Sequence, residues 1–169
     1  MIITQTERLT IRYIEDKDAS FLLDLYNQPA FLENIGDRGI HDLGSAQEFI
    51  KSIRQRYDQV GFWLYILEET SSGQPVGVNG LLQRDFLDAP DIGFGIDQKH
   101  WRKGYAFESS QAIIKHARDL SHEKLLAITS PKNANSINLL LKLGFNFSKC
   151  DDLEGCGEQV NLYEINLLQ

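Results

Sequence analysis

The stretch that leads from a strand into a helix at Gly104 constrains the fold of this chain more than any other part of its sequence. Asp91–Ile96 is a predicted strand, a short loop follows it, and a helical pattern begins at the glycine. A helix N-terminus presents unpaired backbone N–H groups and a partial positive charge. Arg102 and Lys103 precede the glycine, and Ala106 leaves the first helical turn uncrowded. The stretch therefore predicts either a pyrophosphate-binding turn or a plain loop with two solvated basic residues.

The rest of the sequence alternates between strand and helix patterns. The predicted strands are Glu7–Ile14, Phe62–Leu67, Val76–Leu82, Asp91–Ile96, Leu125–Thr129, Phe145–Phe147 and Val160–Ile165. The predicted helices are one that opens at Asp16 and stops at Asn27–Pro29, one that follows a capping box at Ser45–Glu48, then Gly104–Leu120 and Asn133–Lys142. The order β-α-α-β-β-β-α-β-α-β-β predicts an α/β fold with one mixed, mostly antiparallel sheet.

Length and composition favour a single domain over residues 1–169, large enough to bury a core without disulfides. The only cysteines are Cys150 and Cys156, and the four histidines are scattered, so no metal site is expected. The N-terminus lacks the apolar core of a signal peptide, and no apolar stretch approaches bilayer length. We therefore expect a cytoplasmic protein.

The net charge of -7 at pH 7 argues against a partner that is a nucleic-acid backbone or an anionic membrane surface. The acidic balance is compatible with a cationic or amine-bearing partner, and it is also common among proteins that are acidic for solubility alone.

The segment Trp101–Ala106 resembles motif A of the GCN5-related N-acetyltransferases (GNAT), [Gln/Arg]-x-x-Gly-x-[Gly/Ala]. Gly104 and Ala106 fill its last two positions, whereas Trp101 departs from the first. The tryptophan variant with a glutamate at Glu108 resembles the branch of the ribosomal-protein N-terminal alanine acetyltransferases. The resemblance extends over nearly the whole chain, through Thr6–Arg12, Ile92–Phe94, Pro131–Ser136 and Leu143–Phe145.

This resemblance implies a GNAT-like sheet whose fourth and fifth strands, near Ile96 and Ile128, diverge around the thioester of acetyl-CoA. Gly93 and Gly95, which are poor strand formers, mark either such a splay or bulge or tight packing against a neighbouring helix. Acetyl-CoA is then the co-substrate, without a metal. The residues expected to bind it are Phe94, Gly95, Ile96, Arg102, Lys103, Gly104, Tyr105, Ala106 and Asn133. Asn133 is also a candidate N-cap for the following helix.

Transfer to an amine requires a base, and Asp91 is our first candidate because its strand runs beside the expected thioester. It competes with a group of nearby acids that would all be solvated loop residues in the alternative interpretation, namely Asp85, Asp88 and Asp97. By resemblance, Ser136 is the candidate acid for the departing thiolate; otherwise it is a helix-surface serine. Arg38 either binds a carboxylate of the acceptor or pairs with Asp37 or Asp42.

The sequence thus predicts an N-acetyltransferase that moves an acetyl group from acetyl-CoA to a primary amine by direct attack in a ternary complex. The acceptor is a protein N-terminus or a small amine, with the net charge favouring cationic acceptors. Amides of Gly95 or Ile96 would polarise the acetyl carbonyl. The alternative is a non-catalytic acyl-CoA-binding or regulatory module on the same fold. Either a monomer or a homodimer is expected.

Overall fold

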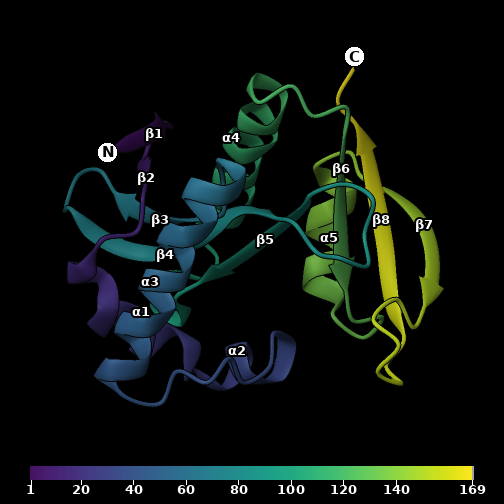
Figure 1. Cartoon of the computed structure of the whole chain (residues 1–169). Coiled ribbons are helices and arrows are strands. Elements are labelled where there is room, and N and C mark those ends of the chain that lie inside the picture. The colour runs from purple at the N-terminus through teal and green to yellow at the C-terminus, as the bar shows by residue number, and fades with distance from the viewer. Residues whose placement is uncertain (169) are drawn as a thin grey trace.

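The computed structural model describes residues 1–168 and arranges them around one 8-stranded sheet (Figure 1). The spatial order of the strands is β1-β2-β3-β4-β5-β6-β8-β7, and every neighbouring pair is antiparallel except the parallel pair β5–β6. The strands are β1 (Ile2–Gln5), β2 (Leu9–Arg12), β3 (Leu64–Glu69), β4 (Gln74–Leu82), β5 (Asp91–Ile96), β6 (Lys124–Thr129), β7 (Asn146–Asp151) and β8 (Val160–Asn166). The predicted mixed, mostly antiparallel sheet is confirmed.

Helices cover both faces of this sheet. They are α1 (Ala19–Tyr26), α2 (Pro29–Asn34), α3 (Leu43–Val60), α4 (Tyr105–Asp119) and α5 (Ala134–Lys142). Leu64 and Ile66 of β3 belong to a buried cluster with α1 and α3, which Figure 1 shows grouped over β3 and β4. Tyr65 and Leu67 belong to a second cluster with α4 and α5. Burial on both faces explains why this strand reads as a continuous apolar run.

Strands β5 and β6 separate soon after they meet. Their register is limited to Asp91 opposite Leu126, where the Leu126 N–H donates to the Pro90 carbonyl at 2.9 Å. By contrast, β5 pairs with β4 along its entire length. The predicted divergence near Ile96 and Ile128 is confirmed, and it leaves one edge of β5 open.

Two elements of the structure, β1 and α2, are absent from the predicted order. The expected strand Glu7–Ile14 is present only over Leu9–Arg12, as β2, and β1 pairs with it at the edge of the sheet. Pro29 does follow the end of α1, but it also begins α2 at the first helical position, where a missing N–H costs nothing.

The helix cap of α3 differs from the prediction. The N-cap is Asp42, not Ser45; its Oδ1 accepts the Ser45 N–H at 2.7 Å, and Ser45 Oγ accepts the Asp42 N–H at 3.0 Å. The prediction failed because an Asp three residues before a Ser forms the same reciprocal box as a Ser three residues before a Glu.

No helix within residues 1–168 combines the length and apolar character that crossing a bilayer requires.

Candidate active site

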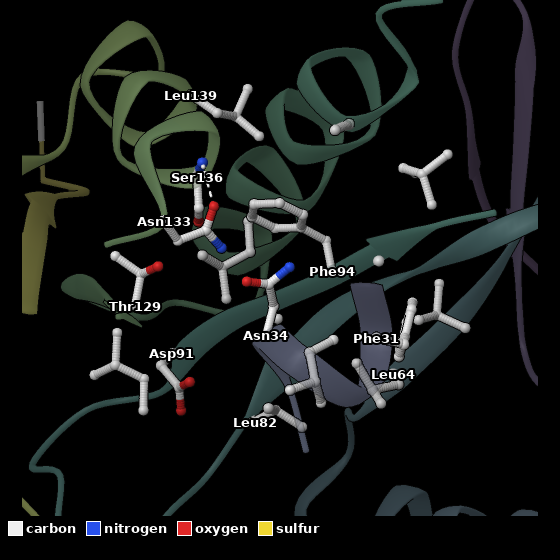
Figure 2. A pocket seen from close by; sticks show the side chains of 18 of the residues that line it. Phe31, Asn34, Leu64, Leu82, Asp91, Phe94, Thr129, Asn133, Ser136 and Leu139 are labelled. Carbon is white, nitrogen blue, oxygen red and sulfur yellow. Dashed lines mark hydrogen bonds between the residues drawn. The ribbon is translucent and has the colours of Figure 1, made fainter. Parts of the chain in front are cut away.

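The divergence of β5 and β6 opens a groove of about 1300 Å³ (Figure 2). One side is formed by β5, the turn before α4 and the first turn of α5. The other side is formed by side chains of α1, α2, the following loop, α3 and the residue before β3; we call this side the helical wall. Its lining residues are Tyr26, Ala30, Phe31, Asn34, Ile35, Arg38, Phe49, Ser52, Arg56 and Trp63.

The turn before α4 has an unusual backbone. Arg102 and Gly104 both have positive φ, 64° and 81°, in the left-handed region that non-glycine residues seldom adopt. The N–H groups of Gly104 through Phe107 donate to no acceptor in the described part of the chain; the first backbone donor of the helix is Glu108. We call the segment from Arg102 to Phe107 the cradle, since its free N–H groups at a helix N-terminus form an anion-binding concavity.

Most of the predicted cofactor-binding residues line the groove: Phe94, Gly95, Ile96, Arg102, Gly104, Tyr105, Ala106 and Asn133. Lys103 is not among the lining residues, and its Nζ lies 3.0 Å from His100 Nδ1. Tyr105 contributes through its backbone, because its buried hydroxyl donates to Glu69 Oε2 at 2.5 Å. Trp101, which departs from the usual motif, donates from its indole to the Ile96 carbonyl at 2.8 Å and so ties the turn to the end of β5.

The register of β5 determines which of its amides face the groove. The Asp97 N–H donates to the Val76 carbonyl at 2.8 Å, and the β4–β5 register is regular, without a bulge. Backbone groups alternate in direction along a strand, so Gly95 directs its N–H to β4. The amides of Phe94 and Ile96 face the open edge instead. Of the two amides predicted to polarise an acetyl carbonyl, only that of Ile96 is available, and Phe94 joins it.

Gly95 serves packing rather than a bulge. A Cβ built there would lie 2.1 Å from Phe31 Cζ, so α2 rests directly on β5. At Gly93 the nearest contact would be the flexible Leu82 Cδ1 at 3.0 Å. Tight packing against a helix, the alternative interpretation, therefore holds for Gly95, and this contact brings the helical wall beside the open strand edge.

Asp91 is not a solvated loop acid. Its side chain is 1% exposed, lines the groove, and accepts from Arg84 Nε with both oxygens at 3.1 Å. Burial raises the pKa of Asp91 to about 6, against the opposing effect of the Arg84 guanidinium. A carboxylate with this pKa changes protonation state near neutral pH, as a general base must.

The other three acids near Asp91 have different surroundings. Asp97 is buried and structural; it accepts from Gln28 Nε2 at 3.0 Å and from the Lys99 N–H at 3.1 Å. Asp88 lies outside the groove lining and forms an exposed ion pair with Lys124. Asp85 is exposed and lines the groove. Asp91 is thus the one buried carboxylate of this group that lines the groove.

Asn133 and Ser136 come from the first turn of α5. The predicted N-cap is present, since Asn133 Oδ1 accepts the Ser136 N–H at 3.2 Å. Both side chains line the groove, so capping leaves the Asn133 amide nitrogen available to a ligand. Figure 2 shows them on the side of Phe94, with Asp91 on the opposite side near Leu82.

Glu108, noted in the sequence only as a motif residue, joins the chain's N-terminal hairpin to the cradle. Its carboxylate accepts from Thr6 Oγ1 at 2.6 Å, the Arg8 N–H at 3.0 Å and Arg8 Nε at 2.8 Å. Arg8 in turn lies over the Tyr105 ring, 4.6 Å from its centroid. Arg8, Arg84 and the residues of the helical wall other than Arg38 give no signal in the sequence, because the residues they contact are remote in sequence.

Comparison with known proteins agrees with this geometry. A family model described as "Acetyltransferase (GNAT) domain" matches residues 8–146. The chain belongs to the GNAT acetyltransferase family. The resemblance seen in the sequence and the expected acetyltransferase activity are both confirmed, and the non-catalytic alternative is not favoured.

Three relatives illustrate the match. An uncharacterized N-acetyltransferase, p20 of Bacillus licheniformis, is 28% identical over 170 residues, covering 97% of this chain and 94% of its own. The [Ribosomal protein uS5]-alanine N-acetyltransferase of Escherichia coli K12 is 29% identical over 147 residues, covering 83% and 76%. The structure of RimL, a ribosomal L7/L12 alpha-N-protein acetyltransferase in complex with coenzyme A, superposes with a TM-score of 0.83 over 98% of both chains at 18% identity. The last likeness is one of fold.

No group of three or more His, Cys, Asp or Glu side chains suited to a metal ion occurs among residues 1–168.

Proposed function

We propose that this GNAT enzyme transfers the acetyl group of acetyl-CoA to a primary amine by direct attack in a ternary complex. One observation carries the proposal: free backbone N–H groups of the cradle, the open edge of β5, and the buried carboxylate of Asp91 all face a single groove. The RimL structure, which holds coenzyme A, supports the choice of co-substrate. Because the sheet and both cores involve segments from the whole described chain, we treat the chain as one acetyltransferase domain.

The cradle suits the pyrophosphate of coenzyme A. Four free N–H groups, those of Gly104 to Phe107, lie at the positive end of the 15-residue helix α4, and Arg102 lines the same part of the groove. The amides of Phe94 and Ile96 would pair with the polar groups of the pantetheine arm, as an added strand would. The amide of Asn133 would bind the same arm from α5.

The reaction needs a neutral amine, a polarised thioester and a protonated leaving group. In our proposal Asp91 accepts a proton from the amine through a chain of water molecules, and the amine nitrogen attacks the acetyl carbonyl. The acetyl carbon then lies nearer Phe94 than Ile96, because Ile96 is roughly 17 Å from Asp91 along the extended strand. The open-edge amide of Phe94 stabilises the oxyanion that forms. The carbon–sulfur bond then breaks, and the thiolate takes a proton from Ser136, which is restored from solvent. The products are an N-acetylated amine and free coenzyme A.

The E. coli relative acetylates an alanine N-terminus of a ribosomal protein, which keeps a protein N-terminus among the acceptors we propose, beside small amines. The test is release of the CoA thiol from acetyl-CoA in the presence of a panel of primary amines and N-terminal peptides, with acetylated product identified by mass spectrometry. We expect thiol release to depend on the amine and to match product formation. Tight binding of acetyl-CoA without amine-dependent release for any member of the panel would overturn the proposal and favour a binding module.

A further inference from the structure

The helical wall combines a rigid aromatic surface with two arginines. The Tyr26 ring packs against Phe31 and Phe49, with centroids 4.8 and 5.1 Å apart, so these rings hold one another in place. Beside them, Arg56 lies over the ring of Trp63 at 4.7 Å, and Arg38 lines the groove from the loop that follows α2. An apolar wall with cationic groups fits a ligand that has both an apolar body and a negative charge.

The arginines of this protein divide into two groups. Four of them form ion pairs with carboxylates: Arg8, Arg12, Arg54 and Arg84. The other four pair with no carboxylate in the described part of the chain, and three of those four line this one groove: Arg38, Arg56 and Arg102. In a protein of net charge -7, carboxylates are in excess, so unpaired guanidinium groups concentrated at one cavity indicate an external anion.

Arg56 is oriented by its own helix and by Trp63. It stands seven residues after Phe49 and four after Ser52, on the face of α3 that lines the groove. Its guanidinium carbon lies over the Trp63 ring, and its N–H groups donate to no acceptor in the described part of the chain. Arg56 therefore has donors free for bidentate recognition of a carboxylate or phosphate.

For Arg38, the local alternative of pairing with Asp37 or Asp42 does not hold. The Asp37 carboxylate accepts the Gly39 N–H at 2.8 Å and lies 3.3 Å from His41 Nε2. Asp42 caps α3 through Ser45. The sequence left open whether Arg38 binds the acceptor or pairs with Asp37 or Asp42. In the structure both carboxylates have other partners, and neither forms an ion pair with Arg38.

Acids also line the groove, but within the described part of the chain none of them forms an ion pair with Arg38 or Arg56. Asp91 is paired with Arg84, while Asp85 follows that arginine in the β4–β5 connection and Glu154 belongs to the loop between β7 and β8. The third unpaired arginine of the groove, Arg102, belongs to the cradle on the opposite side from the helical wall. The two remaining cations therefore stand on the side of the groove left for the acceptor.

From this arrangement we infer that the acceptor is a primary amine that also carries an anionic group, a carboxylate or a phosphate, bound by Arg38 and Arg56. This inference rests on the proposed acetyltransferase function and narrows its substrate class. It reverses the expectation drawn from net charge, because local charge at the groove is opposite to the charge of the whole protein.

Matched pairs of amines test the inference. Each pair differs only in the anion: phenylalanine against phenylalaninamide, phosphoethanolamine against ethanolamine, and N-terminal peptides with aspartate against asparagine at the second position. We expect kcat/KM for the anionic member of the best pair to exceed that for its neutral partner about 10- to 100-fold, the range of hydrogen bonds to charged groups. The pairs also tell a carboxylate from a phosphate, and a free amino acid from a peptide.

Arg38→Gln and Arg56→Gln should each lower this anionic-to-neutral ratio about tenfold. Arg54→Gln is the matched control, because Arg54 lies on the same helix but pairs with Asp16 outside the groove; it should leave the ratio unchanged. Equal rates for charged and neutral members, preference for cationic amines, or the same ratio in both variants and wild type would overturn the inference.

Calorimetric titration of the same amines into the CoA-loaded enzyme separates this inference from the proposed function. Anion-dependent binding that requires Arg38 and Arg56, without turnover of any amine, would support the subsite and overturn catalysis. Equal turnover of neutral and anionic amines would support catalysis and overturn the anion subsite.

Discussion

The two sides of the groove are built in different ways. The cradle is a contiguous segment that presents backbone N–H groups. Among its side chains, Tyr105 turns its hydroxyl away from the groove to Glu69. The helical wall presents side chains from α1, α2, the following loop, α3 and the residue before β3. A backbone site persists through many side-chain changes, whereas a side-chain site changes its ligand with each substitution. If the cradle binds the co-substrate and the helical wall binds the acceptor, as we propose, this contrast would allow the acceptor to change while the co-substrate stays the same.

The largest effect is expected where the two sides meet, at Asp91. Asp91→Asn should lower kcat about 10²- to 10⁴-fold by removing the base. In the wild-type enzyme the rate should rise as pH increases through about 6, because Asp91 accepts a proton only when ionised. In the variant the rise should move to higher pH, since the amine must then arrive already neutral. Steady-state rates from pH 5 to 9 measure both effects.

Asp88→Asn is the control for this experiment, because Asp88 is exposed and pairs with Lys124 outside the groove. If Asp91→Asn kept the wild-type rate and pH profile, proton removal would fall to another group, and Asp91 would serve only to hold Arg84.

Gly104→Val should weaken coenzyme A binding about tenfold, because a β-branched residue is disfavoured at φ 81° by about 1–2 kcal/mol and so shifts the turn away from the conformation that presents the cradle's N–H groups. Gly73→Val is the matched control: Gly73 has a similar φ of 70° in the turn between β3 and β4, away from the groove. Calorimetry with coenzyme A distinguishes the two. Equal loss of affinity in both variants would indicate a general folding defect, and no loss at Gly104 would contradict the cradle assignment.

Gly95→Ala should affect the helical wall more than the cradle. The new methyl group would displace Phe31, and overpacking of this kind costs about 1–3 kcal/mol. We expect kcat/KM for the amine to fall about tenfold, with coenzyme A affinity nearly unchanged. Gly93→Ala, on the same face of β5 but against flexible Leu82, should have a smaller effect.

Adding Phe31→Leu to Gly95→Ala should restore part of the loss by making room for the methyl group. A loss confined to coenzyme A affinity would show that Gly95 is needed for the open edge of β5 and not for the packing of α2 against this strand.

The smallest effect is expected at Ser136. Ser136→Ala should lower turnover less than about tenfold, at or below the low end of general acid catalysis, because the thiolate of coenzyme A leaves readily. Coenzyme A affinity should not change, since the contact to Asn133 uses the Ser136 backbone N–H, which alanine retains. A large rise in the dissociation constant of coenzyme A would instead assign Ser136 to binding.

The position of the cradle was predictable because its signals are local, whereas the divergence of β5 and β6 was implied by the resemblance to the GNAT family. Positive φ at Gly104 and the cap at Asn133 depend on residues within one turn, and the bounds of β5 follow from the loops beside it. The same local logic misjudged α3, because Asp42 and Ser45 offered a competing cap of the same kind.

The sequence by itself therefore determined the family, the order of most elements and the position of the cradle. Only the tertiary structure decided which amides of β5 face the groove, because that depends on register with β4. It also decided that Asp91 is buried beside Arg84 and that Arg38 and Arg56 share one wall. These properties arise from contacts between segments that are distant in sequence, and neither periodicity nor local backbone preference encodes them.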